Sequence, residues 1–100
     1  MTRLDITPQE RSRLRAQAHG LNPVVLIGAK GLTPSVLKET DHSLTAHALI
    51  KLRIASADRA EREAMLAQLC DALDCAPVHH LGRTLVLYRP RPQDAQAGNT

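Results

Sequence analysis

The sequence contains no tryptophan and no phenylalanine, and its one aromatic residue is Tyr88. Modules that recognise unpaired bases stack them on aromatic side chains, so this chain cannot provide such a stacking platform. Apolar residues still make up 43% of the 100 residues, which excludes a chain that is disordered by composition. The core of the expected domain must therefore consist of leucine, isoleucine, valine and alanine side chains.

Cysteine is also scarce, because Cys70 and Cys75 are the only two and lack the paired C-x2-C clusters of a zinc site. We expect two reduced thiols, as in a cytoplasmic protein. No apolar run approaches the roughly 20 residues that span a membrane. The opening MTRLDITPQE contains no apolar segment of a signal peptide. These absences predict a soluble, cytoplasmic protein that does not contact a membrane.

A catalytic group of residues is missing as well. Asp41 and His42 are neighbours on a predicted helix and face different directions, and no nucleophile accompanies them with a base and an orienting group. His79 and His80 are adjacent on a predicted strand, so their side chains point to opposite faces and make a poor metal site. We therefore expect no enzyme activity, no metal and no cofactor.

Charge is unevenly distributed, although the formal net charge is only +3. Residues 1–53 hold 8 basic and 4 acidic side chains, whereas residues 54–100 hold 5 basic and 6 acidic ones. A positive field concentrated in the first half attracts phosphates or an acidic partner. A solvated surface with a chance bias explains the charges equally well, so charge alone does not choose between them.

Three segments carry helix signals. Thr7, Pro8 and Glu10 form a capping box that opens a helix over 8–19, and Gly20 is a natural stop after it. The Thr-Pro opening is repeated before the helix pattern of residues 33–47. The third and strongest helix covers 58–74, with Asp58 as its cap and an apolar side made of Met65, Leu66, Leu69, Cys70 and Leu73.

Four segments carry strand signals. PVVLIG at 23–28 is a continuous apolar run, which predicts a strand that is buried on both faces. LIKLRIA at 49–55 alternates, so that Ile50, Leu52 and Ile54 point to a core while Lys51 and Arg53 point to solvent. The runs 76–82 and 84–90 flank Gly82 and Arg83, which suit the two-residue turn of a hairpin.

The predicted order of elements is α-β-α-β-α-β-β, which defines an α/β fold. The two β-α-β units should cross over right-handedly and form parallel pairs, and the final hairpin adds an antiparallel strand. We expect one compact domain over residues 1–90 with a mixed four-stranded sheet. Residues 91–100 have no apolar periodicity, which predicts a mobile tail.

The segment GAKG, Gly28–Gly31, joins the first predicted strand to a helix N-terminus. Glycines permit a positive φ and a close approach of another backbone, and the free N–H groups of the helix favour a phosphate. A G-x-x-G loop of this kind clamps the nucleic-acid backbone in KH domains, although a tight turn alone explains a lone G-x-x-G more simply. The loop is too short for a Walker motif and is not G-x-G-x-x-G, which excludes nucleotide hydrolysis and dinucleotide binding.

Three motifs in order, LNPVVLIGAKGLTPSVLKE, LIKLRI and GRTLVLYRP, resemble the CRM domain family, named for chloroplast RNA splicing and ribosome maturation. The resemblance covers residues 4–90 and is nearest to the stand-alone bacterial members, the YhbY-like proteins. It implies an RNA-binding α/β domain, similar to the C-terminal domain of a translation initiation factor. It also implies association with precursors of the large ribosomal subunit.

The resemblance further implies that the glycine loop contacts RNA backbone and that basic residues extend this surface. The residues expected to bind RNA are Gly28, Ala29, Lys30, Gly31, Arg11, Arg15, Lys38, Lys51, Arg53 and Arg83. The expected partner is structured ribosomal RNA of the large-subunit precursor, bound by a monomer. Two alternatives stay open: a module that docks an acidic protein on the same surface, and a small enzyme that acts on phosphorylated ligands.

Overall fold

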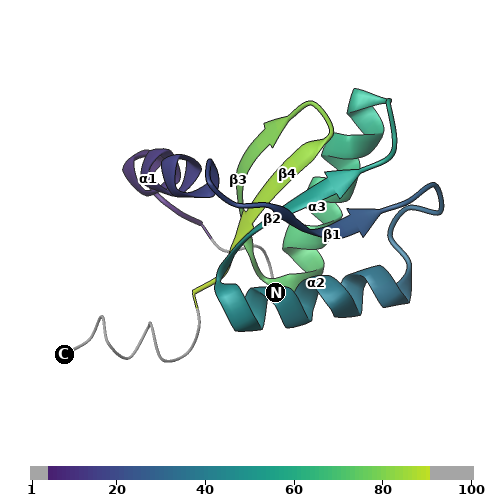
Figure 1. Ribbon diagram of the computed structural model, residues 1–100, viewed down its shortest axis with the longest axis horizontal. Coiled ribbons are helices and arrows are strands. Elements are labelled where there is room, and N and C mark those ends of the chain that lie inside the picture. Colours follow the sequence, from purple (N-terminus) through teal and green to yellow (C-terminus); the bar gives the residue numbers. More distant parts are fainter. Residues whose placement is uncertain (1–4, 91–100) are drawn as a thin grey trace.

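Helices and strands alternate along residues 5–90, the part of the chain that the computed structural model describes (Figure 1). The predicted tail at 91–100 lies outside these residues. The elements are α1 (Pro8–Ala18), β1 (Pro23–Ile27), α2 (Pro34–His47), β2 (Leu49–Ile54), α3 (Arg59–Leu73), β3 (Ala76–Leu81) and β4 (Thr84–Tyr88). The predicted order of elements is therefore confirmed, and each predicted element ends within two residues of the observed one.

The four strands form one mixed sheet in the order β1-β2-β4-β3. Strands β1 and β2 are parallel, while β4 is antiparallel to both β2 and β3. The expectation of a second parallel pair is wrong, because β4 lies between β2 and β3. Two facts favour this insertion: the short turn at Gly82 and Arg83 pairs β4 with β3, and the buried centre of β4, Leu85–Leu87, suits an interior strand.

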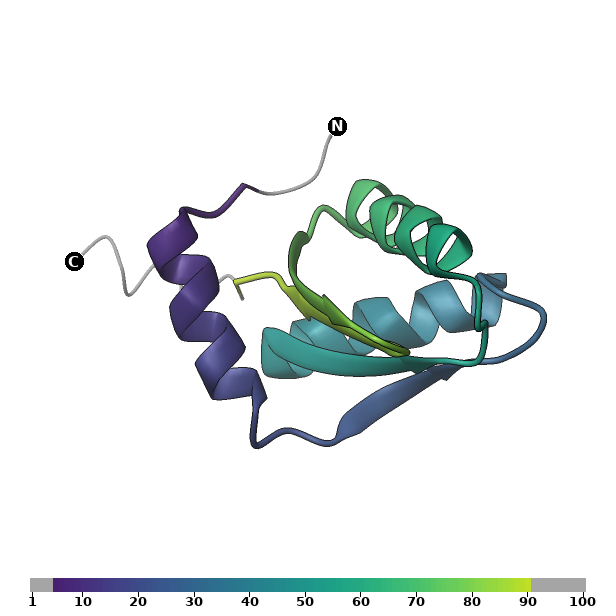
Figure 2. The same ribbon diagram turned by 90° about the horizontal axis from the view of Figure 1, so that it is seen from above.

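Opposite faces of the sheet carry different helices, and α1 stands apart from α2 and α3 (Figure 2). The alternation along β4 shows this directly. Leu85 and Leu87 belong to the main core with α2 and α3, whereas Val86 between them packs with Leu14 and Ala18 of α1. The first helix therefore covers the face that α2 and α3 leave open.

Both cores are aliphatic, as the composition predicts. The main core contains Val25, Ile27, Leu44, Ile50, Leu52, Ile54, Leu69, Cys70, Cys75, Leu85 and Leu87. The smaller core contains Leu14, Ala18, Val78 and Val86, flanked by Ile6, Leu49 and Tyr88. Both cysteines are free thiols in the main core, and the hydrogen bond with Cys70, together with burial, raises the pKa of the Cys75 thiol. Cys75 is therefore a packing residue.

The prediction that the first strand is buried on both faces is wrong. Val25 and Ile27 are buried in the main core, but Val24 and Leu26 are 44% and 65% exposed. The reason is that β1 is an edge strand and the short helix α1 packs on the other three strands. A continuous apolar run does not reveal which of its two faces a helix will cover.

Helix caps follow the sequence signals closely. The Glu10 backbone N–H donates to Thr7 Oγ1 over 3.1 Å, and the Thr7 N–H donates to Glu10 Oε1 over 3.0 Å. These bonds also lower the pKa of the Glu10 carboxyl. Thr33 Oγ1 accepts from Val36, and Asp58 Oδ1 accepts from Ala60. The entry into each helix is thus fixed by a side-chain oxygen that satisfies a free backbone donor.

Arg89, just after β4, connects three elements of the fold. Its guanidinium donates to Asp41 Oδ1 and Thr45 Oγ1 on α2, over 2.8 and 2.9 Å. The same group donates over 2.9 Å to the carbonyl of Leu73 at the end of α3. Only 22% of the side chain is exposed. Arg89 therefore fixes where the ends of α2 and α3 meet the last strand.

We expect Arg89→Gln to lower the free energy of unfolding by about 1–3 kcal/mol, because it leaves a carbonyl and a carboxylate without their donor. The matched control is Arg59→Gln, which removes an exposed ion pair with Glu63 on α3 and should cost less than about 0.5 kcal/mol. Urea unfolding of both variants measures the difference. Equal losses would contradict the role given to Arg89.

Candidate functional site

The loop Gly28–Gly31 lies at the end of the sheet that is far from α1, where β1 turns into α2 (Figures 1 and 2). The Gly31 N–H donates to the Gly28 carbonyl over 3.0 Å and closes the turn. Gly28, Ala29 and Lys30 are exposed, while Gly31 is half-buried. The tip of the loop is thus fully available to a ligand.

The two glycines of the loop have different reasons to be glycine. Gly31 has a φ of +73°, a conformation that side chains with a Cβ rarely adopt, so the turn itself requires it. Gly28 has no positive φ, and a Cβ built there meets nothing within 4 Å. The fold therefore explains Gly31 and leaves Gly28 unexplained, which is the pattern expected if an external group approaches the backbone at Gly28.

Two backbone hydrogen bonds bring other segments to the same end of the sheet. The Ala55 N–H donates to the Ile27 carbonyl just before the loop, and the Ile54 N–H donates to the Arg83 carbonyl in the β3–β4 turn, each over 2.8 Å. The end of β2 therefore lies between the glycine loop and the turn. The exposed cations of Lys30, Arg53 and Arg83 therefore lie at the same end of the sheet.

A row of side chains crosses all four strands next to this end of the sheet. The strand register pairs Leu26 with Arg53, Arg53 with Thr84, and Thr84 with Leu81. These four residues share the face that carries α1, yet α1 packs at the other end of the strands, on Leu49, Val86 and Tyr88. We call Leu26, Arg53, Thr84 and Leu81 the open row. Its outer leucines are 65% and 66% exposed.

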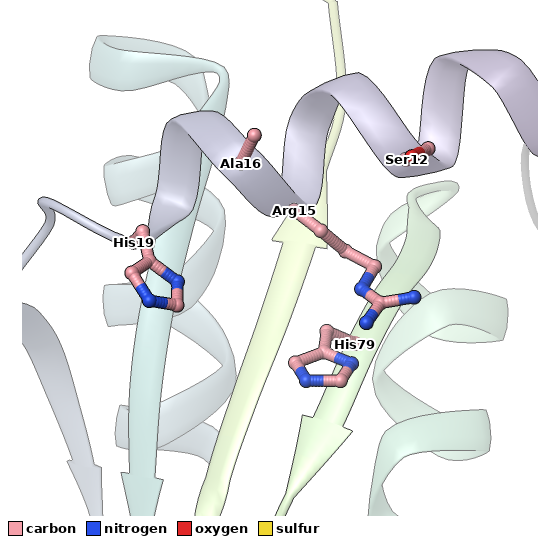
Figure 3. A pocket seen from close by; sticks show the side chains of 5 residues that line it. All are labelled: Ser12, Arg15, Ala16, His19 and His79. Atoms are coloured by element: carbon pink, nitrogen blue, oxygen red, sulfur yellow. The ribbon is translucent and has the colours of Figure 1, made fainter.

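Between the open row and α1 the surface is hollowed. A pocket there is lined by Ser12, Arg15, Ala16, His19 and His79, with the Arg15 guanidinium reaching toward the His79 ring (Figure 3). An adjoining hollow adds Lys51, Leu81, Thr84 and Val86. Burial lowers the pKa of His79, and the positive charge of Arg15 and the neighbouring His80 and His19 lower it further.

The predicted site residues fall into separate groups. Lys30, Arg53 and Arg83 lie at the end of the sheet that carries the glycine loop. Arg15 and Lys51 line the hollow on the face that carries α1. Arg11 is half-buried and donates its Nε–H to the Pro77 carbonyl over 3.2 Å, so it also joins α1 to β3. Lys38 is exposed on α2, which covers the opposite face.

The sequence does not indicate that His79 lies next to Arg15. His19 follows Arg11 and Arg15 at helical spacing, so the basic stripe on α1 was visible in the sequence. His79 comes from β3, and no spacing in the sequence relates it to α1. Only the packing of α1 on this strand brings the two histidines to one pocket.

Within residues 5–90 no group of three or more histidine, cysteine, aspartate or glutamate side chains is arranged to hold a metal ion. In the same part of the chain, no helix has the length and apolar character to cross a membrane. The two pockets that contain Arg15, His19 and His79 are hollows on the face of the sheet that carries α1. Their lining combines the cations of Arg15 and Lys51 with the exposed Leu81, which suits an extended anionic ligand.

Comparison with known proteins shows the family of this chain. The sequence profile of the CRS1 / YhbY (CRM) domain matches residues 6–89. A Haemophilus influenzae protein named RNA-binding protein is 39% identical over 85 residues, which are 85% of this chain and 86% of the relative. A protein of Pseudomonas aeruginosa named as a probable RNA-binding protein is 33% identical over 88 residues, 88% of this chain and 85% of the relative.

The fold also matches a solved structure. The solution structure of a hypothetical protein from Staphylococcus aureus superposes with a TM-score of 0.78 at 26% sequence identity. The match covers 85% of this chain and 88% of that one. The mixed four-stranded sheet with three helices is therefore shared with this protein.

The difference between the two loop glycines can be measured. We expect Gly31→Ala to destabilise the protein by about 1 kcal/mol, because alanine is strained at positive φ. Gly28→Ala should change the free energy of unfolding by less than about 0.5 kcal/mol, because its Cβ meets no neighbour. Thermal or urea unfolding of the two variants tests this. A large loss at Gly28 would show that the fold itself requires both glycines.

Proposed function

Because the chain belongs to the CRS1 / YhbY (CRM) domain family, we propose that it is a non-enzymatic RNA-binding protein of the cytoplasm that assists assembly of the large ribosomal subunit. The observation that carries this proposal is the exposed Gly28–Gly31 loop, whose first glycine the fold does not require. Relatives named as RNA-binding proteins support it. The association with large-subunit precursors follows from the resemblance to YhbY-like proteins.

The loop would bind the sugar-phosphate backbone. A phosphate can approach Gly28 closely because no Cβ projects there, and Lys30 adds a full positive charge at the tip. The N-terminus of α2 follows directly, with its partial positive charge and no acidic residue in the first turn. Arg53 and Arg83 lie at the same end of the sheet and would bind the neighbouring phosphates.

The open row would extend the contact across the sheet. Its leucines offer apolar surface to riboses and base edges, while Arg53 between them offers a charge. With a single aromatic residue in the sequence, the surface cannot stack successive bases, so it recognises backbone and shape. Structured RNA is the ligand that such a surface fits.

The complete proposed surface contains Gly28, Ala29, Lys30, Gly31, Arg53, Arg83, Lys51, Arg15, Arg11 and Lys38. Arg53, Lys51 and Arg15 share the face of the open row, while the glycine loop and Arg83 lie at the end of the sheet beside it. Arg11 would contribute from the hollow beside β3 with the donors that its bond to Pro77 leaves over. Lys38 would contact RNA that passes the loop toward α2. The protein would bind as a monomer.

Affinity for RNA should fall steeply with salt. If Lys30, Arg53, Arg83 and Arg15 neutralise about four phosphates, binding weakens roughly 50- to 150-fold between about 50 and about 200 mM salt. Lys30→Ala should weaken binding several-fold and reduce the slope of log Kd against log salt by about one. Fluorescence anisotropy with an RNA hairpin measures both. Arg59→Ala, which removes an exposed cation of α3 that is already paired with Glu63, is the control and should change neither.

Binding that does not depend on salt would overturn the phosphate mechanism. A protein that ignores RNA but forms a complex in lysate resistant to ribonuclease would instead be a module for an acidic protein partner. Ribonuclease treatment separates the two cases, because an RNA-bridged complex dissolves and a direct protein complex survives.

The ribosomal part of the proposal has its own test. In a sucrose gradient of cell lysate at low salt, we expect the protein to sediment with precursors of the large subunit, and high salt should release it. Lys30→Ala should shift part of the protein to the top of the gradient. If the wild-type protein stays at the top at every salt concentration, the link to the ribosome is wrong, whatever its affinity for isolated RNA.

A further inference from the structure

The pocket between α1 and β3 combines three groups that can carry positive charge. Arg15 and His19 project from α1, and His79 projects from β3 beneath them (Figure 3). Ser12 and Ala16, both small, form the rest of the wall. The pocket encloses about 530 Å³ and is open to solvent, so it has room for a phosphate group with part of its hydration shell.

No acidic side chain lines this pocket or the two hollows that adjoin it, among the residues that the structure describes. Elsewhere the protein pairs such charges, as Arg89 with Asp41 and Arg59 with Glu63. In residues 5–90, Arg15 has no carboxylate within ion-pair distance. The pocket therefore holds an uncompensated positive charge with titratable neighbours, which is the composition of an anion site.

We propose that this pocket is a second phosphate site of the protein, and that a phosphate bound there draws a proton onto His79, so that RNA binds more tightly as the pH falls. This inference rests on the proposed function for the identity of the ligand, a phosphodiester of RNA. The pocket joins the open row through Lys51, Leu81 and Thr84, on the same face. An RNA backbone that starts at the glycine loop can therefore reach it across the sheet.

The surroundings of His79 fix the sign of the effect. The charged and titratable groups that line hollows together with His79 are Arg11, Arg15 and His19 from α1, His80 from β3, and Lys51 from β2. Strand β4 contributes only Thr84 and Val86. His80 is turned to the other face, where its Nε2 accepts from Arg62 Nε over 3.1 Å. Every charged neighbour is thus cationic or becomes cationic on protonation.

In the free protein, burial and the positive charge of Arg15 lower the pKa of His79 and so disfavour its charged form. Folding is therefore favoured above the ordinary pKa of histidine and loses that contribution as the pH falls through the lowered value. A bound phosphate places a negative charge among these groups and so raises the pKa of His79. Proton uptake then accompanies binding, and lower pH must strengthen it by linkage.

The test measures the affinity of an RNA hairpin of about 20 nucleotides at about pH 8 and about pH 5.5, at constant ionic strength. For the wild-type protein we expect roughly tenfold tighter binding at the lower pH, since a pKa rise of one unit corresponds to tenfold. His79→Gln and the double variant with His19→Gln should lose most of this gain. His42→Gln, exposed on α2 at the other face, is the matched control and should keep it.

An NMR titration of the histidine rings gives a second readout. The pKa of His79 should rise by about one unit when the hairpin is added, and inorganic phosphate at high concentration should raise it in the same direction. His42 should not respond. This measurement does not depend on how well the variants fold, because it uses the wild-type protein.

The outcomes separate this inference from the proposed function. If RNA binds and Lys30→Ala weakens it, but the pH gain is the same in His79→Gln and its pKa does not move, the pocket is not a phosphate site and the proposed function stands. If RNA does not bind at any pH while inorganic phosphate still raises the pKa of His79, the pocket is an anion site and the proposed ligand is wrong. If neither ligand has an effect, both fail.

Discussion

A four-stranded sheet has two faces to cover, and this chain provides long helices for only one of them. Helices α2 and α3 bury the main core, whereas α1 has 11 residues and contributes only Leu14 and Ala18 to the smaller core. The end of the second face that carries Leu26 and Leu81 therefore stays open to water. The open row, the exposed leucines and the pocket beside α1 all result from this shortage of apolar cover, since a longer first helix would bury them.

Local signals in the sequence determine most of the fold. Caps at Thr7 and Thr33, the alternation of residues 49–54 and the turn at Gly82 each act within a few residues, so a reader of the sequence can find them. The exposure of Leu26 could not be found in this way. It depends on where α1 packs, and that is decided by contacts between segments far apart in the chain.

The candidate site divides along the same line. The glycine loop and the outward side chains of β2 can be recognised in the sequence. The roles of single arginines cannot, because a count of basic residues treats every arginine as surface charge. Arg89 fixes α2 to α3, and Arg62 is buried against His80 and the Ser56 carbonyl. Arg83, in contrast, lies in the β3–β4 turn, and its carbonyl accepts a hydrogen bond from the end of β2 that also meets the strand before the glycine loop.

The two faces of the protein also differ in charge, which gives the molecule a preferred orientation toward a polyanion. The exposed side of α3 carries Glu61, Glu63 and Asp71, and it lies on the face opposite the open row. On the proposed function, α3 would repel a polyanion and the face with Arg53 and Arg15 would attract it, so the long-range field would turn the open row toward it before contact. The small net charge therefore understates the electrostatic effect, because the arrangement of charge, more than its sum, guides the approach.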